Sequence, residues 1–191
     1  SYAERLLSLH DEAKIAVTDI NTSPKGKLLI GANEATFLYV LPEIFSIFKD
    51  KYPNVQISIY RNFTKKVLEK VRTNQLDFGI VTLPISGDEL NVLPISKEEL
   101  WLITEPKHPL NKKSSCTIND LISYPFIFHS AGTTRERLVK RFGRVWNELN
   151  ISMELASIET IKKFVSIGMG ISIVPRSYAE KENEEGVLHL Q

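Results

Sequence analysis

Three short polar stretches, each placed directly after an apolar run, contain the side chains best suited to binding chemistry. They read NEAT at residues 33–36, NFT at 62–64 and HSAGTT at 129–134. Amides and hydroxyls form hydrogen bonds without exchanging protons, and a helix that starts at such a turn has unpaired backbone N–H groups with partial positive charge. The pattern therefore predicts a site that binds a small anion and does not transform it.

The predicted ligand contacts come from these turns and from Thr82, which follows a further apolar strand. They are Asn33, Ala35, Thr36, Asn62, Phe63, Thr64, Thr82, His129, Ser130, Gly132, Thr133 and Arg135. A simpler explanation suits each helix-start threonine taken singly, because Thr is a common N-cap of helices. Both roles are compatible, since a residue that caps a helix at this edge also faces the crevice.

Three of the predicted contacts have alternative interpretations. Phe63 either closes over a ligand or packs against the protein. Arg135 is a candidate anion partner because its charge opposes the dipole at a helix start, but an ordinary solvent-exposed arginine is the simpler explanation. His129 either responds to charge and pH in the crevice or is a hydrogen-bonded structural histidine, and the second is the more common case.

Neither a catalytic centre nor a metal site is predicted. The histidines are scattered without metal-ligand spacing, and Cys116 is the sole cysteine, so no internal disulfide can form. No paired-carboxylate, Ser–His–Asp or phosphate-loop motif occurs. We therefore expect a binding module with no enzymatic activity, no metal and no cofactor.

Composition limits the partners and the compartment. The chain of 191 residues is long enough for two small lobes. Its formal net charge of +1 is too small to attract nucleic acid, so we do not expect this chain to bind nucleic acid by itself. No apolar run reaches the length of a membrane span, and the first residues are charged where a signal peptide is apolar. With Ser1 in place of an initiator methionine, we expect a fragment of a cytoplasmic protein.

The elements that position the polar turns alternate between strand and helix. Strands are expected first at residues 27–32, 55–60, 78–81, 90–95 and 100–104. Helical spacing separates the early strands, and Pro42 predicts a kink or a late helix start. This order implies parallel strands joined by right-handed crossovers.

A second series of elements begins near Pro106. Strands are expected at residues 126–128, 151–156 and 171–174, and helices at 133–149 and 158–167. Gly168 and Gly170 lie at a helix-to-strand junction, where glycine permits positive φ and close backbone approach. The predicted fold is α/β with two lobes and a cleft between them, lobe I at 26–105 and lobe II at 106–191.

The N-terminal segment, residues 1–23, is expected to be a linker and dimerisation helix. Its apolar side chains follow the three-and-four spacing of a coiled-coil seam, at Leu6, Leu9, Ala13, Ala16 and Ile20. Pro24 and Gly26 then end the helix. An ordinary amphipathic helix that packs on its own domain explains this segment equally well.

A series of motifs then recurs in a set order. They are GKLLIG at residues 26–31 followed by LP at 41–42, LDFGI at 76–80, HPL at 108–110 and GMGISIVP at 168–175. Each motif alone is weak, but their joint order resembles the effector-binding domain of LysR-type transcriptional regulators. The resemblance covers residues 26–175, and the seam at Leu6 to Ile20 lies where the family's linker helix belongs.

The resemblance implies a two-lobed fold of the type II periplasmic-binding-protein kind that binds a small effector at the same turns. It also implies a homodimer or homotetramer that contacts promoter DNA only through a winged helix-turn-helix outside these residues. The family's C-terminal return to lobe I is expected to be missing. The rival interpretations are an extracytoplasmic solute-binding protein of the same fold and a cleft enzyme, although an enzyme would need an acid–base pair in the crevice.

Overall fold

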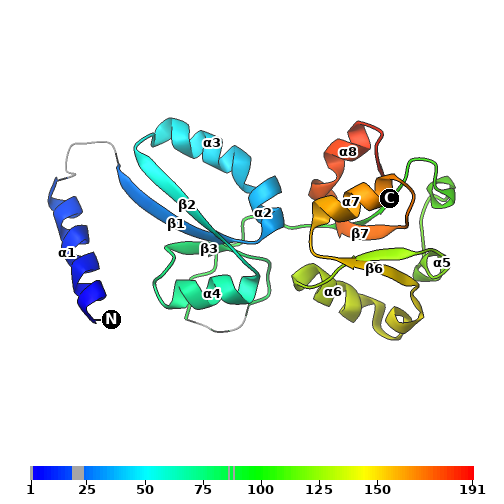
Figure 1. Cartoon of the computed structure of the whole chain (residues 1–191), viewed down its shortest axis with the longest axis horizontal. Coiled ribbons are helices and arrows are strands. Elements are labelled where there is room, and N and C mark those ends of the chain that lie inside the picture. The colour runs from blue at the N-terminus through cyan, green and yellow to red at the C-terminus, as the bar shows by residue number, and fades with distance from the viewer. Residues whose placement is uncertain (1, 19–23, 86, 88) are drawn as a thin grey trace.

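The computed structural model describes residues 2–18, 24–85, 87 and 89–191. Two α/β lobes follow one another along the chain, and helix α1 (Tyr2–Thr18) lies beyond lobe I, at the end away from lobe II (Figure 1). The prediction of two α/β lobes preceded by an N-terminal helix is therefore confirmed. No described helix is long and apolar enough to cross a membrane.

Lobe I is built on a three-stranded parallel sheet of order β2-β1-β3. Its elements are β1 (Gly26–Ala32), α2 (Glu34–Tyr39), α3 (Leu41–Lys51), β2 (Val55–Arg61), α4 (Thr64–Arg72) and β3 (Phe78–Ile80). β2 and β3 lie on opposite sides of β1, so right-handed crossovers place α3 and α4 on opposite faces of the sheet. Figure 1 shows this arrangement.

Two local features of lobe I follow directly from the sequence. The helical run after β1 breaks at Val40, and Pro42 lies in the first turn of α3, where a missing N–H costs no hydrogen bond. Of the two alternatives predicted at Pro42, a kink or a late helix start, the structure has a new helix start at Leu41. Gly31 and Gly79 let α4 approach the sheet closely, because a Cβ at either position would lie 2.5 Å from Cγ1 of Val67.

Lobe II contains a mixed set of strands. Its elements are β4 (Leu100–Thr104), η1 (Pro109–Lys112), α5 (Ile118–Leu121), β5 (Phe126–His129), α6 (Thr133–Phe142), η2 (Gly143–Glu148), β6 (Ile151–Leu155), α7 (Ile158–Ser166), β7 (Ser172–Pro175), η3 (Arg176–Tyr178), α8 (Glu180–Glu184) and β8 (His189–Leu190). The strands form a sheet of order β7-β4-β8 and a parallel β5-β6 pair, joined by a bridge between Phe126 and Ile171.

The helix expected at residues 133–149 is shorter than predicted. It ends at Phe142, because Gly143 takes φ +56° and the chain continues as the 3-10 helix η2. Phe142 of α6 and Trp146 of η2 still face the core, where they pack with Phe126 and Phe128 as a group of aromatic rings. The helical spacing of apolar residues therefore continues in the sequence beyond Gly143, where the backbone changes from an α-helix to a 3-10 helix.

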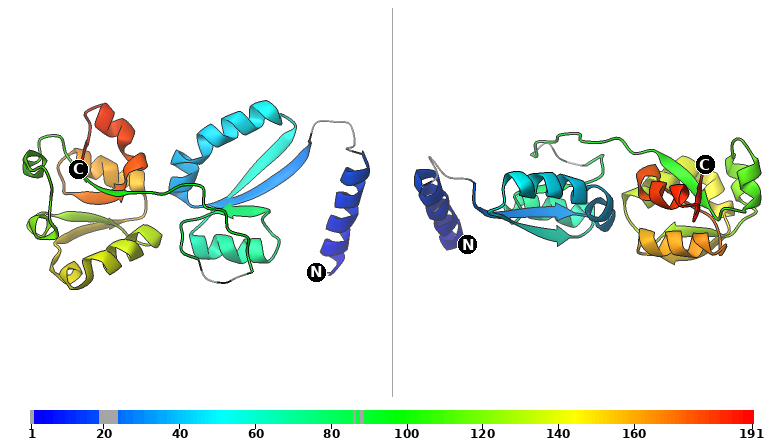
Figure 2. Two further views of the ribbon diagram at one scale, coloured as in Figure 1. Left: turned by 180° about the vertical axis from the view of Figure 1, so that it is seen from behind. Right: turned by 90° about the horizontal axis from the view of Figure 1, so that it is seen from above.

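The crossover between the lobes lies earlier than the sequence indicated. β4 pairs antiparallel with β7 and with β8, so it belongs to the sheet of lobe II. The chain passes from one lobe to the other between β3 and β4, where Figure 2 shows an extended segment. We therefore propose a boundary before Leu100 in place of 105/106.

Residues 90–95 are not a strand, which corrects the prediction. Val92, Leu93 and Ile95 are exposed, with Leu93 at 82% and Ile95 at 59%, and Leu90 is half-buried, because this segment has no strand to pair with among the described residues. Apolar composition alone does not create a strand without a hydrogen-bonding partner.

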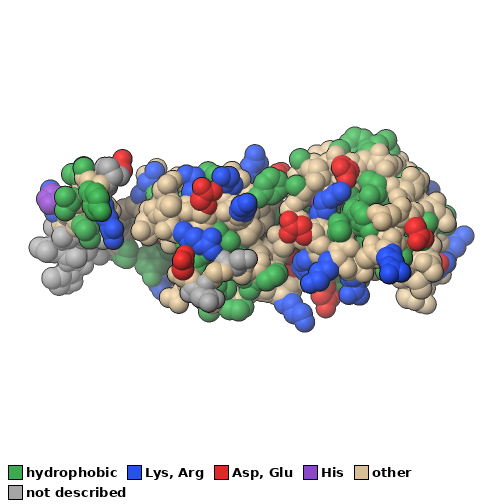
Figure 3. Space-filling view, turned by 90° about the horizontal axis from the view of Figure 1, so that it is seen from below, with side chains coloured by type: hydrophobic (Ala, Val, Ile, Leu, Met, Phe, Trp, Pro, Cys, Tyr) green, Lys and Arg blue, Asp and Glu red, His purple; other side chains and the backbone are tan. Residues whose placement is uncertain are grey.

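Helix α1 does not pack its described apolar side chains on lobe I. Leu6 is 68% exposed and Leu9 54% exposed, and Figure 3 shows apolar side chains uncovered on this helix. The side chains of Ala13 and Ala16, and the whole of Ile20, lie outside the described part of the chain. For Leu6 and Leu9, the alternative of a helix packed on its own domain is wrong.

Candidate ligand-binding site

The strand register of lobe I brings its polar turns to one edge of the sheet. Ala32, the last residue of β1, is paired with Arg61 of β2 and with Ile80 of β3. The N–H of Asn62 donates to the carbonyl of Ala32 over 3.0 Å. Parallel strands that end together place the residues after them side by side, so Asn33, Asn62 and Thr82 follow neighbouring strand ends.

The polar turn of lobe II follows the same geometry. β5 ends at His129 opposite Leu155 of β6, and the N–H of Ser130 donates to the carbonyl of Leu155 over 2.8 Å. Ser130 is exposed, and Gly132 and Thr133 are half-buried at the start of α6. The turn at residues 129–134 is thus attached to a strand end and leads directly into a helix.

The turns of the two lobes meet at Phe63 and Gly132. A Cβ on Gly132 would lie 3.8 Å from Cδ1 and Cε1 of the Phe63 ring, which is ordinary van der Waals contact. Gly132 takes φ +104°, a backbone region that favours glycine. Phe63 keeps 51% of its surface exposed, so its ring lies close to the Gly132 backbone of the opposite lobe and also faces solvent. The turns at residues 62–64 and 129–134 therefore lie on the same side of the molecule.

The threonines at the helix starts are not caps. The N-cap residues of α2, α4 and α6 are Asn33, Phe63 and Gly132, and only Asn33 caps with its side chain, accepting from the N–H of Thr36 over 2.8 Å. Thr64 and Thr133 are the first residues inside their helices. The capping explanation is therefore wrong for the threonines, and Asn33 takes that role in α2.

Residues 33–36 are partly or fully buried, although we expected them to line an open crevice. Thr36 is only 6% exposed, and Ala35 packs against the apolar cluster of lobe II that contains Ile161 and Val165. The start of α2 therefore contacts the opposite lobe directly, so this turn is part of the junction between the lobes as well as of its rim.

Arg135 and His129 hold the second turn in shape. The Arg135 guanidinium donates to the carbonyl of His129 over 3.1 Å, pairs with Glu154 at 2.5 Å and lies 5.2 Å above the Trp146 ring. His129 Nδ1 lies 2.5 Å from the carbonyl oxygen of Ala131. These contacts support the structural interpretation of His129. They also occupy the Arg135 guanidinium, which was a candidate anion partner with a solvent-exposed arginine as the alternative.

A contact between the lobes was missed by the sequence analysis. Ser157, the N-cap residue of α7, donates from Oγ to Glu34 Oε1 of α2 over 3.3 Å. Glu34 Oε2 also lies 3.9 Å from the Arg61 guanidinium. The signal was a serine directly before a predicted helix, which identifies a cap position but not its partner across the junction.

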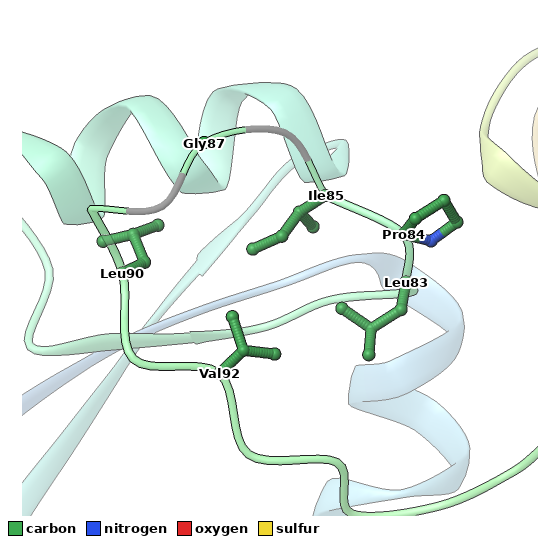
Figure 4. A pocket seen from close by; sticks show the side chains of 6 residues that line it. All are labelled: Leu83, Pro84, Ile85, Gly87, Leu90 and Val92. Carbon is green, nitrogen blue, oxygen red and sulfur yellow. The ribbon is translucent and has the colours of Figure 1, made fainter.

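Lobe I also contains two hollows. The larger, of about 720 Å³, is apolar and is lined by Leu83, Pro84, Ile85, Gly87, Leu90 and Val92 (Figure 4). The smaller, of about 340 Å³, lies between β2 and α4, and Asn62 is its one residue from the predicted contacts. The side chains around the larger hollow are apolar and offer no donors to an anion, whereas the smaller hollow is polar and includes Lys66 and Lys70. The Lys66 ammonium pairs with Glu69 and the Lys70 ammonium donates to Gln75, so both cations already have partners within lobe I. We therefore keep the candidate site at the turns.

The comparison with known families decides the identity of this fold. Residues 21–191 match the family model described as the LysR substrate binding domain. The chain belongs to this family. The LysR family resemblance seen in the motifs at residues 26–175 is therefore confirmed.

Relatives of this LysR substrate binding domain are named as regulators of transcription. The chain is 34% identical over 196 residues to a probable RuBisCO transcriptional regulator of Nostoc sp. and 33% identical to one of Trichormus variabilis, covering 99% of this chain and 58% of each relative. The chain thus spans somewhat more than half the length of these relatives. Their names agree with the prediction that the chain is not an enzyme, and nothing among them supports the solute-binding alternative.

Solved structures of LysR regulatory domains share the fold. The Synechocystis CcmR regulatory domain, solved in complex with 2-PG, is 27% identical with a TM-score of 0.77, over 87% of this chain and 80% of that one. The cofactor-binding domain of the Cbl regulator superposes with a TM-score of 0.78 at 24% identity, over 90% of this chain and 76% of that one. The two-lobed architecture is therefore that of LysR regulatory domains.

Proposed function

We propose that this chain is the effector-sensing part of a LysR-type DNA-binding transcriptional regulator and that it binds a small anionic metabolite between its lobes. The close approach of the Phe63 ring to Gly132 carries the proposal, because it brings a turn of lobe I beside a turn of lobe II on one side of the molecule. A ligand held there touches both lobes and favours the arrangement that it fits best.

The chemistry of this junction suits an anion. α4 and α6 both begin here, and the first N–H groups of a helix have no partner within the helix and a partial positive charge. The hydroxyls of Thr64, Ser130 and Thr133 add donors, and Thr64 and Thr133 are not used as caps. Arg135 is now proposed to hold the turn through Glu154 and the carbonyl of His129 instead of binding the ligand.

Calorimetric titration tests the proposal with named compounds. We suggest 2-PG first, because the similar CcmR domain is bound to it, followed by sulfate, simple carboxylates and phosphate esters. Ser130→Ala should weaken binding by about five- to tenfold, since it removes one donor to a charged ligand. Thr36→Ala should also reduce binding, once its unfolding curve shows an intact fold.

Ser166→Ala is the matched control, because Ser166 is half-buried at the far end of α7 and bonds only within its own helix among the described contacts. It should bind as the unmodified chain does. If no anion of the panel bound, or if Ser130→Ala and Ser166→Ala had equal affinities, the assignment of the effector site to these turns would be wrong.

The partners of the whole protein follow from the same proposal. The family implies a cytoplasmic homodimer or homotetramer that reaches promoter DNA through a domain outside these residues. The near-neutral charge of this chain, +1 overall, agrees with a part that does not itself hold DNA. A mobility-shift assay with promoter DNA should show no binding by the 191 residues alone and binding by the whole regulator.

A further inference from the structure

Helix α2 is held to lobe II at both of its ends. At its start, Glu34 accepts from Ser157 over 3.3 Å. At its last residue, Tyr39 stacks on Tyr178 of lobe II, with ring centroids 4.5 Å apart and planes 14° from parallel. Figure 1 shows α2 between the body of lobe I and helices α7 and α8. The six-residue helix α2 therefore contacts lobe II at both ends, while β1 and α3 on either side of it in the chain connect it to lobe I.

The contact at Tyr39 is completed by a buried lysine. The Lys162 side chain is 4% exposed, and its ammonium lies 4.8 Å from the centre of the Tyr39 ring. The ammonium also donates to the Tyr178 carbonyl over 2.8 Å and pairs with Glu182 at 2.5 Å and Glu159 at 2.9 Å. Three acceptors match its three protons, so the ammonium is fixed in place and the aromatic face covers it.

The Tyr39 ring, and not the Tyr39 hydroxyl, provides the favourable contact with Lys162. A cation above an aromatic face gains strength when it is shielded from water, as Lys162 is. The Tyr39 hydroxyl is buried and has no hydrogen-bond partner among the described residues, which is an unfavourable state for a polar group. The neighbouring Tyr178 hydroxyl, in contrast, donates to Glu98 over 2.8 Å, and burial raises the pKa of Tyr178.

We propose that Tyr39 is a positioning residue, which anchors α2 to lobe II through its ring and thereby fixes the turn at residues 33–36. The relevance of that turn to an effector rests on the proposed function. The anchoring itself does not, so it can be tested without any ligand. In this arrangement the α2 contact is the pivot of the two lobes, and the side at Phe63 and Gly132 is free to open.

Two spin labels measure the anchor directly. With Cys116→Ser removing the native thiol, cysteines replace Leu38 on α2 and Lys181 on α8, both of which are exposed. The parent should give one narrow distance distribution. Tyr39→Ala should broaden it, and Tyr39→Phe should leave it narrow, because phenylalanine keeps the ring and removes only the unpaired hydroxyl.

Hydrogen exchange reports on the turn itself. The N–H of Thr36 is bonded to Asn33 Oδ1, so its exchange rate measures the integrity of the start of α2. Tyr39→Ala should accelerate that exchange by about tenfold and Tyr39→Phe should not, while amides of β5 in lobe II stay protected in both. Protection in β5 shows that the variant is folded.

Tyr39→Leu gives a second variant if alanine prevents folding, because leucine keeps apolar volume without an aromatic face. It should also broaden the distance and accelerate exchange at Thr36. A narrow distance distribution in the Ala or Leu variant would overturn the proposal. A distribution in the Phe variant as broad as in either of them would also overturn it. Failure of every anion to bind would refute the proposed function and leave these readouts unaffected.

Discussion

Single residues at the helix-to-strand junction before β7 show how a short motif acts in three dimensions. A Cβ on Gly170 would lie 2.5 Å from the carbonyl oxygen of Pro125, closer than real Cβ atoms come to backbone. That carbonyl accepts from the N–H of Ile171 over 2.9 Å, so it is held in place. The second glycine of GMG is therefore required by the approach of two backbone segments.

Gly170→Ala should lower the free energy of unfolding by about 1–3 kcal/mol, because a crowded backbone must shift to admit the methyl group. Chemical denaturation measures the loss. Gly26→Ala is the control, since Gly26 also takes a positive φ, at +132°, but no atom lies within 4 Å of the place that a Cβ would take there. Equal losses in both variants would show that backbone strain, and not crowding, explains Gly170.

At the scale of elements, helix α1 needs a partner from another molecule to bury its apolar side chains. Its described leucines are exposed, and an amphipathic helix without a packed face is marginal in water. A second copy of the helix would bury Leu6 and Leu9, as the three-and-four spacing predicts. We propose that α1 is a dimerisation helix on this basis.

Leu6→Lys with Leu9→Lys should shift the chain toward the monomer mass in light scattering, as should removal of residues 1–22. Leu7→Lys is the matched control, because Leu7 is similarly exposed at 65% but lies off the predicted seam. A monomer mass for the unmodified chain would contradict a dimer held by α1, and so would equal effects of the seam and control substitutions.

At the scale of the whole molecule, the lobes are joined by one crossover within the described residues and by contacts at α2, and they approach each other at Phe63. Lobes of one chain that meet at such an interface commonly change their relative angle. A ligand shifts that equilibrium only by its differential affinity for the two arrangements. If α2 is the pivot, the change should be largest on the side of α4 and α6.

Spin labels at Lys65 on α4 and Arg137 on α6, both exposed, should report a changed distance when an anion of the calorimetric panel binds. The label pair at residues 38 and 181 should stay unchanged in the same sample. A bound ligand with no change at either pair would show that sensing does not use a change in lobe angle. Changes at both pairs would place the pivot elsewhere.

The sequence by itself determined the order of elements, the interruption of the helical run at Pro42 and the family, because these depend on local spacing and on motifs contiguous in the chain. It also located the polar turns, since strand ends are visible as the ends of apolar runs. It misjudged residues 90–95 and the lobe boundary because strand formation depends on a partner that is distant in sequence.

Only the tertiary structure decided what the turn residues do. It showed that Asn33 and not Thr36 caps α2, that Arg135 is occupied by Glu154, and that Tyr39 meets Lys162 across the junction of the lobes. Residue types and spacing indicate which groups can bond, but the partners of Arg135 and Tyr39 lie on other elements. Such pairings arise when packing brings remote segments together, so no local pattern could reveal them.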